Sequence, residues 1–290
     1  GLAKRREPIK DRDQLRIGIV GSGFMGRTYT ECLARYNEYA KPVAVAGGKR
    51  APKLAADYGL EYIPTVPELI TRTDVDALIL TTPEMAHLEE VQMAAAAGKH
   101  ILVEKPMAPD VSQAGGMMKI CEEAGVTLMV VQSQRFRRAH RLAKQWISDG
   151  RIGAVRQIRY RGFQTIDSTL RMVGDRPFYL DAAGGGLFMG FAVHAFDMVR
   201  WLAGADAVSI SAQAKRYGEH QIPNSSAMAH IDFENGAMAQ VWCCLELPGP
   251  AFPRSHFRTQ IVGERGMLDV DGYSHFDATT GTGWERVFEQ

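Results

Sequence analysis

The sequence predicts an α/β protein with a parallel sheet in its first half and an open-faced sheet in its second half. Up to about Gln132, short apolar runs alternate with helical segments, which is typical of βαβ units on a parallel sheet. After that point, longer strands alternate apolar with polar residues and are joined by hairpin turns such as Asn235-Gly236. This second pattern indicates a largely antiparallel or mixed sheet with one face open.

The first half is predicted to form five strands separated by four helices. The strands are almost purely apolar, which fits a sheet covered on both faces. Glycines mark the ends of several helices, as is common for helix C-termini. The predicted strands are 15–20, 42–47, 75–83, 100–106 and 126–132, and the predicted helices are 26–36, 51–59, 87–99 and 111–125.

The second half is predicted to form an α+β domain. A helix that ends at Gly150 precedes a first alternating strand, and a run of three glycines, Gly184 to Gly186, leads into a second helix. Longer alternating strands then follow. The predicted helices are 140–150 and the segment through 193–204, and the predicted strands are 154–163, 207–217, 225–247 with its hairpin, and 258–272.

Length and composition fit two domains and ordinary burial of a core. The chain has 290 residues, 46% of them hydrophobic, and a typical domain takes about 150 residues. The change of pattern therefore divides the sequence into a polar tail at 1–13, a first domain at 14–133 and a second domain at 134–290.

Charge and cysteine usage exclude several classes of protein. A net charge of +1 favours neither nucleic acid nor an anionic membrane as a partner, and no apolar stretch is long enough to cross a bilayer. The N-terminal segment lacks the apolar core of a signal peptide. The four cysteines show no paired framework, which predicts a reducing, cytoplasmic location. Neither the cysteines nor the histidines have metal-ligand spacing, so no metal site is predicted.

A glycine-rich turn after the first strand predicts a dinucleotide site. Gly21, Gly23 and Gly26 form a GxGxxG pattern, with Phe24 and Met25 between the last two glycines. The glycines permit a tight turn, close approach of a pyrophosphate, and packing of the helix against the strand. The N-terminus of the following helix offers free N–H groups to the anion. Because strand, turn and helix occur in this order, we predict a Rossmann dinucleotide-binding domain.

The tip of the second strand bears on the choice between NAD and NADP. An NAD site usually has a carboxylate there for the ribose hydroxyls, but this sequence has Gly47 and Gly48 followed by Lys49 and Arg50. The two cations could pair with a 2′-phosphate, which favours NADP. Cations at the start of a helix can also be merely solvated, so NAD stays open.

A lysine stands just past the fourth predicted strand. Glu104 and Lys105 follow this strand, and Pro106 ends its pairing. Ligands of open α/β sheets lie at the carboxyl ends of the strands, so Lys105 is expected to point toward the reactive end of the cofactor. A desolvated lysine there can donate a hydrogen bond or move a proton. The alternative is a surface ion pair between Lys105 and Glu104.

Four segments together resemble one enzyme family. GxGxxG, "TTPEMAH", "AAGKHILVEKP" and the glycine run followed by a histidine and an aspartate occur in the order seen in the Gfo/Idh/MocA oxidoreductases. The resemblance implies an N-terminal Rossmann domain and a C-terminal domain whose open sheet forms a homodimer or homotetramer. It also implies that a small-molecule substrate lies between the domains against the nicotinamide.

The resemblance assigns roles to individual residues. Lys105 is expected to touch both substrate and nicotinamide, and His194 to contact the reacting hydroxyl. Arg135, in a segment that often reaches the active site, is expected to contact substrate. Further cofactor contacts are expected from Thr81, Thr82, Pro83, His87 and Glu104.

One position departs from the family pattern. Many members have an aspartate four residues before the histidine, on the same helix face, but this chain has Gly190 there. Asp197 could orient the ring of His194, and Asp181 is another acid that could reach the site. The departure leaves room for a cyclic or aromatic diol as an alternative to the expected sugar or cyclitol substrate. The alternative function is a non-catalytic sensor of NAD(P).

Overall fold

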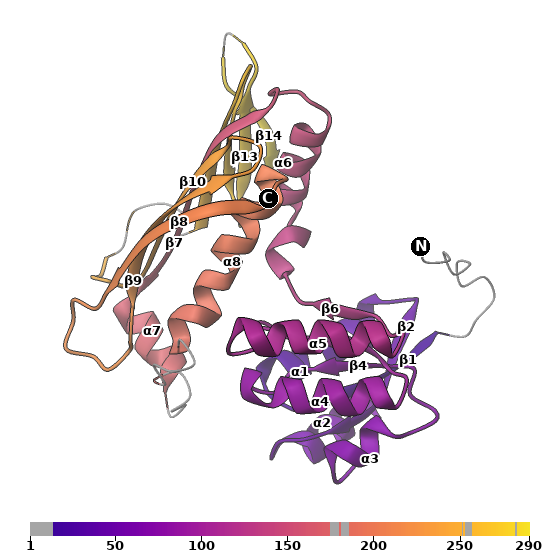
Figure 1. The fold of residues 1–290 in the computed structure, drawn as a ribbon. Coiled ribbons are helices and arrows are strands. Elements are labelled where there is room, and N and C mark those ends of the chain that lie inside the picture. Colours follow the sequence, from indigo (N-terminus) through magenta and orange to yellow (C-terminus); the bar gives the residue numbers. More distant parts are fainter. Residues whose placement is uncertain (1–13, 175–179, 181–185, 251, 253–256, 282) are drawn as a thin grey trace. The chain divides into compact units, whose positions relative to one another are not determined.

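The computed structural model describes residues 14–174, 180, 186–250, 252, 257–281 and 283–290 (Figure 1). Its contacts divide the chain between Val131 and Gln132 into two compact parts, which we call the first and the second unit. The first unit contains a parallel sheet and the second a mostly antiparallel sheet, so the predicted fold class is confirmed. The sequence places the boundary two residues later, after 133.

The first unit is built on a six-stranded sheet in the order β3-β2-β1-β4-β5-β6. Every pair of neighbouring strands is parallel. The strand order reverses between β1 and β4, which is where open α/β sheets bind their ligands. The strands are β1 (Leu15–Val20), β2 (Ala40–Ala46), β3 (Glu61–Tyr62), β4 (Ala77–Leu80), β5 (His100–Val103) and β6 (Leu128–Val130).

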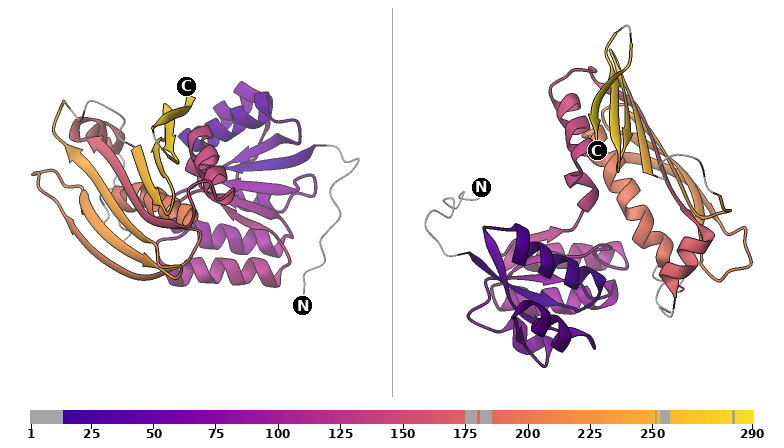
Figure 2. Two further views of the ribbon diagram at one scale, coloured as in Figure 1. Left: turned by 90° about the horizontal axis from the view of Figure 1, so that it is seen from above. Right: turned by 180° about the vertical axis from the view of Figure 1, so that it is seen from behind.

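Helices cover both faces of this sheet, as the apolar strands predict (Figure 2). One apolar cluster joins the strands to α1 (Phe24–Tyr36) and α2 (Ala51–Tyr58). A second cluster joins them to α3 (Val66–Ile70), α4 (Glu84–Ala96) and α5 (Val111–Glu123). Because both faces are buried, the polar ends of the strands are where this unit can meet a ligand.

The second unit contains an eight-stranded sheet in the order β14-β13-β12-β11-β7-β10-β9-β8. The β7–β10 pair is parallel and the other pairs are antiparallel. The strands are β7 (Val155–Thr165), β8 (Ala207–Lys215), β9 (Ser226–Phe233), β10 (Met238–Leu247), β11 (Phe257–Gly263), β12 (Met267–Asp271), β13 (His275–Thr279) and β14 (Glu285–Glu289).

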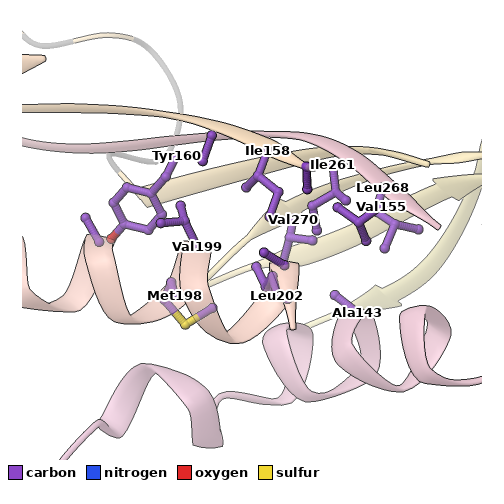
Figure 3. Packing of buried hydrophobic residues seen from close by; sticks show 14 of the residues in the cluster. Ala143, Val155, Ile158, Tyr160, Met198, Val199, Leu202, Ile261, Leu268 and Val270 are labelled. Atoms are coloured by element: carbon purple, nitrogen blue, oxygen red, sulfur yellow. The ribbon is translucent and has the colours of Figure 1, made fainter. Parts of the chain in front are cut away.

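Helices pack on one face of this second sheet. The unit begins with the 3₁₀ helix η1 (Ser133–Phe136) and α6 (Arg138–Ser148), and α8 (Gly186–Ala203) lies along the strands. Met198 and Leu202 of α8 are fully buried against β7, β11 and β12 (Figure 3). The opposite face has none of the described helices on it (Figures 1 and 2).

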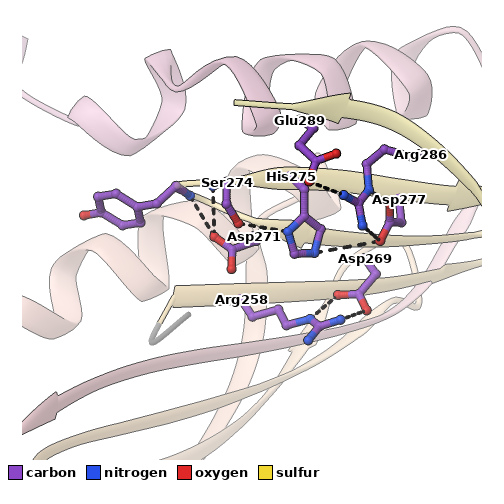
Figure 4. A network of polar contacts seen from close by, with 9 residues as sticks. Arg258, Asp269, Asp271, Ser274, His275, Asp277, Arg286 and Glu289 are labelled. Carbon is purple, nitrogen blue, oxygen red and sulfur yellow. Dashed lines mark hydrogen bonds and ion pairs between the residues drawn. The ribbon is translucent and has the colours of Figure 1, made fainter. Parts of the chain in front are cut away.

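The last four strands are also tied together by ion pairs. Arg258 of β11 binds both carboxylate oxygens of Asp269 on β12, and Arg286 of β14 does the same to Asp277 on β13 (Figure 4). Two-pronged arginine–carboxylate pairs add geometric specificity to a strand pairing. They therefore help to hold the register of strands that are short and rich in charge.

The structure contains elements that the sequence patterns do not predict. β3 has two residues and α3 has five, which is too short for a periodic pattern to appear. α7 (Ile166–Val173) follows β7 directly, where Thr165 caps it by accepting a hydrogen bond from the backbone N–H of Ser168. β13 and β14 carry charged side chains, which obscure the alternation of apolar and polar residues that would mark them as strands in the sequence.

Candidate active site

The glycine turn joins β1 to α1. Gly21 has a φ of +98°, and a Cβ placed on it would lie 2.6 Å from Oγ1 of Thr81. A Cβ on Gly26 would lie 2.1 Å from the carbonyl oxygen of Gly21, so only glycine lets α1 approach the strand this closely. By contrast, no described heavy atom lies within 4 Å of a Cβ built on Gly23. The space at the helix N-terminus is therefore open, which fits a bound pyrophosphate.

Thr81 supports the turn from the neighbouring strand. Its hydroxyl lies 2.9 Å from the carbonyl oxygen of Val20 and 3.1 Å from that of Gly21. Thr81 is an expected cofactor contact, and these hydrogen bonds show that its side chain also holds the turn in place.

The tip of β2 carries the two predicted cations. Gly47 and Gly48 have φ values of +82° and +80°, and a Cβ on Gly48 would lie 2.6 Å from Oγ of Ser22. Lys49 and Arg50 follow at the start of α2, and both are exposed. Neither forms an ion pair with a described residue. Their charge is therefore available to an anionic group at this strand end.

Side chains of α4 hold the loop that follows β4. His87 is only 1% exposed, and its Nδ1 and Nε2 atoms lie 3.0 and 2.9 Å from the carbonyl oxygens of Met107 and Thr82. The buried carboxyl group of Glu90 accepts a hydrogen bond from the Thr82 hydroxyl at 2.5 Å. His87, which the sequence places in the cofactor lining, thus acts on the protein backbone. Thr82 and Pro83 remain the expected cofactor contacts of this loop.

Glu104 and Lys105 lie where β5 ends. Glu104 is 6% exposed, and its carboxylate accepts the hydroxyl of Tyr29 and the backbone N–H of Lys105, the latter at 2.9 Å. Glu104 is therefore a buried carboxylate that binds these two donors, not a surface group. Burial lowers the pKa of Lys105, while the negative charges of Glu104 and Glu84 act in the opposite direction.

In the second unit, Arg135 and Asp197 bind each other. Arg135 on η1 donates two hydrogen bonds, of 2.8 and 2.5 Å, to the carboxylate of Asp197 on α8. The hydrogen bonds that Arg135 donates to Asp197 raise the pKa of Arg135. Among the described residues, no hydrogen bond joins Asp197 to His194, and this carboxylate instead binds Arg135 through both oxygens. The pair fixes η1 against α8.

His194 and Gly190 share one face of α8 because they are four residues apart. His194 is half-buried, and its Nδ1 atom is fully buried. A Cβ built on Gly190 meets no described heavy atom within 4 Å. Among the described residues there is thus room beside His194, at the position where the family pattern has an aspartate. Asp181, the further predicted acid, lies outside the described residues.

The parallel sheet brings four predicted segments of the first unit together at one edge. The glycine turn, the tip of β2, Thr82 and Lys105 all follow the carboxyl ends of neighbouring strands. His194, Arg135 and Asp197 belong to the second unit. Sequence reasoning missed Tyr29 and Glu90; the only signal for Tyr29 is its place one helical turn after Gly26.

The described residues also limit what else the chain could do. Among them, no three or more His, Cys, Asp or Glu side chains are grouped to hold a metal ion. No helix in the described part of the chain is long and apolar enough to cross a membrane.

A parallel sheet with a glycine turn at its switch point is the architecture of a dinucleotide-binding domain. Two family models match the chain. Residues 15–132 match the oxidoreductase family with an NAD-binding Rossmann fold, and residues 140–269 match the GFO/IDH/MocA C-terminal domain. The chain belongs to the Gfo/Idh/MocA oxidoreductase family.

Individual relatives are similar over most of the chain. The scyllo-inositol 2-dehydrogenase (NAD(+)) of Bacillus subtilis is 28% identical over 278 residues, which cover 92% of this chain and 76% of the relative. The inositol 2-dehydrogenase of Rhizobium meliloti is 32% identical over 202 residues, which cover 69% of this chain and 58% of the relative. The crystal structure of a putative myo-inositol dehydrogenase from Sinorhizobium meliloti superposes with a TM-score of 0.77 at 25% identity, covering 94% of this chain and 81% of that one.

The raised pKa of Glu90 predicts a pH-dependent stability. Burial raises this pKa from 4.5 to about 7, against the opposing hydrogen bond from Thr82. Between these two values the folded chain retains a proton that the unfolded chain has released, so stability falls as the pH rises through the window. In the unmodified chain, the free energy of unfolding should fall by about 2–3 kcal/mol between pH 5 and 8 because of Glu90. We expect this fall to disappear in Glu90→Gln. Urea denaturation across this pH range measures it.

Glu89→Gln is the matched control, because Glu89 is the exposed neighbour on the same helix. It should leave the pH dependence close to that of the unmodified chain. An unchanged slope in Glu90→Gln would contradict the assignment.

Proposed function

We propose that this oxidoreductase transfers a hydride between a nicotinamide cofactor and a hydroxyl- or carbonyl-bearing carbon of a small polyhydroxylated molecule. The observation that carries the proposal is the place of Lys105, half-buried at the end of β5 on the sheet edge that also holds the glycine turn. The bound nicotinamide supplies or accepts the hydride. The side chains of the protein must then handle the proton and polarise the reacting oxygen.

Lys105 and His194 are the proposed catalytic residues. A lysine whose pKa burial lowers toward the working pH exchanges a proton more readily than an exposed lysine. His194 is a second titratable donor whose natural pKa lies near neutrality. One of the two residues takes or gives the proton, and the other donates a hydrogen bond to the oxygen of the substrate.

We propose NADP as the preferred cofactor. The tip of β2 has no carboxylate to bind ribose hydroxyls, and the positive φ angles of Gly47 and Gly48 disfavour one there. Lys49 and Arg50 instead put two exposed cations just after this strand, which supports pairing with a 2′-phosphate. The relative from Bacillus subtilis is named for NAD(+), so cofactor preference can differ between members.

The proposed substrates are sugars or cyclitols, the class to which the inositols of the named relatives belong. Gly190 changes the surroundings of His194, because a carboxylate at that position would hydrogen-bond a substrate hydroxyl. Its absence favours a substrate with fewer hydroxyls on that side, including a cyclic or aromatic diol. It also favours the second candidate, a sensor that binds NAD(P) without turnover.

We also propose a homodimer or homotetramer formed through the open face of the second sheet. Large apolar side chains on this face are 37–50% exposed, and their strand neighbours point into the core. They are Met228, Met238, Val262 and Met267. A cytoplasmic location is proposed from the four cysteines, all of them free.

The catalytic assignment predicts a large loss of turnover in two variants. Lys105→Ala and His194→Ala should each lower kcat by about a hundredfold or more, because each removes a group that contacts the reacting oxygen. Reduction of NADP⁺ with myo-inositol and scyllo-inositol as probes, followed by absorbance, measures this. Lys119→Ala, an exposed lysine on α5, is the control. If both site variants keep full turnover, the catalytic assignment fails. If the unmodified protein binds NADPH but turns over no polyol or diol, the second candidate, a sensor, is favoured.

The cofactor preference predicts a selective loss of affinity. The double variant Lys49→Ala/Arg50→Ala should bind NADPH about tenfold or more weakly, while its affinity for NADH stays within about twofold. Isothermal titration calorimetry measures both. Lys53→Ala is the control, since this lysine lies one turn further along α2 and pairs with Asp57. Equal losses for the two cofactors would contradict a 2′-phosphate site.

The open space at Gly190 predicts a gain of function. Gly190→Asp should raise kcat/KM for the inositol probes by about tenfold, because the new carboxylate would share a helix face with His194. Gly190→Ala, which fills the same space without a charge, should not. If Gly190→Asp does not raise kcat/KM, position 190 does not contact the substrate hydroxyls, and the prediction is contradicted.

A further inference from the structure

A buried carboxylate lies directly beside the proposed catalytic lysine. Glu104 is 6% exposed, and burying a carboxylate is costly unless hydrogen bonds satisfy it. One oxygen accepts the Tyr29 hydroxyl, and the other accepts the backbone N–H of Lys105 at 2.9 Å. Glu104 thus connects a side chain of α1 to the backbone of the lysine itself.

Tyr29 comes from the helix that the glycine turn begins. It lies three residues after Gly26 and packs against the apolar cluster beneath α1 and α2. Burial and the hydrogen bond to Glu104 both raise the pKa of Tyr29 above its usual value. The hydroxyl therefore keeps its proton at ordinary pH and acts as a donor to the carboxylate.

We propose that Tyr29 and Glu104 are positioning residues that set both the placement and the electrostatic surroundings of Lys105. The inference rests on the proposed function, in which Lys105 moves the proton. The chain of contacts runs from α1, through the Tyr29 hydroxyl and the Glu104 carboxylate, to the N–H of Lys105. Helix α1, which begins at the glycine turn, is thereby linked to Lys105, the proposed proton-transfer residue.

The negative charge of Glu104 affects the pKa of Lys105, in addition to the positioning by its hydrogen bonds. Two described carboxylates act on the charge of Lys105: Glu104 on its own loop and Glu84 at the start of α4. The neutral Tyr29 donates its hydroxyl to Glu104. Burial lowers the pKa of Lys105, and the two carboxylates oppose this. Removing the charge of Glu104 must therefore favour the uncharged amine.

The test compares Glu104→Gln and Tyr29→Phe with Tyr58→Phe in the full chain. Tyr58 is a matched control, because its hydroxyl also donates to a glutamate, Glu31, at 3.1 Å, on the outer side of α1. The first readout is the pH dependence of Lys105 acetylation by acetic anhydride, measured by mass spectrometry of the peptide. It reports the protonation of Lys105 without any substrate. The second readout is kcat, KM and the NADPH dissociation constant.

We expect Glu104→Gln to move the acetylation midpoint of Lys105 to lower pH by about one unit, because an opposing charge is lost. Tyr29→Phe should shift it less and to higher pH, because the Glu104 carboxylate loses a donor that shares its charge. It should also lower kcat about tenfold, with the NADPH dissociation constant unchanged. Tyr58→Phe should match the unmodified chain in every readout.

Unchanged midpoints and kcat in both site variants would overturn the inference. If Glu104→Gln does not fold, Tyr29→Phe decides by itself, since it removes a single hydroxyl. Full turnover in Lys105→Ala would defeat the proposed function instead; the acetylation midpoints would still decide whether Tyr29 and Glu104 set the surroundings of Lys105.

Discussion

The close approach of α1 to the end of β1 is the constraint on which the site depends. A Cβ on Gly26 would lie 2.1 Å from the carbonyl oxygen of Gly21, far inside any tolerable contact. Because that Cβ is absent, the helix N-terminus lies against the strand end and leaves open space beside Gly23. The same placement brings Tyr29 within hydrogen-bonding reach of Glu104. One packing contact thus shapes the glycine turn and also positions Tyr29 against Glu104.

Buried polar groups in the first unit hold loops rather than react. His87 and Glu90 on α4 bind the segment at Thr82, and Glu104 binds the backbone of Lys105. Each of these groups has polar partners, which offsets the cost of removing it from water. The exposed cations at the tip of β2 and the half-buried Lys105 lie at the ends of neighbouring strands, the edge where open α/β sheets bind ligands.

The sequence predicted the fold and the edge of the sheet where the site lies, because those features follow from local patterns. Apolar runs and glycines mark the strand ends, and parallel strands must carry those ends to one edge. The sequence could not predict the pairing of Arg135 with Asp197 or of Tyr29 with Glu104. These partners are 62 and 75 residues apart, and only the packing of elements brings them together. For the same reason, the sequence did not reveal that Asp197 binds Arg135 through both oxygens.

The most direct test of the central claim is the affinity of Gly23→Ala for NADPH and NADH, measured by calorimetry beside thermal unfolding. Gly23 has an ordinary φ of −71°, so alanine fits the backbone, but its methyl group would occupy the space left for the pyrophosphate. The account predicts that the unmodified chain binds a dinucleotide and that the variant loses this affinity while its melting temperature is kept. Undiminished binding by the variant, or no binding by the unmodified chain, would contradict it.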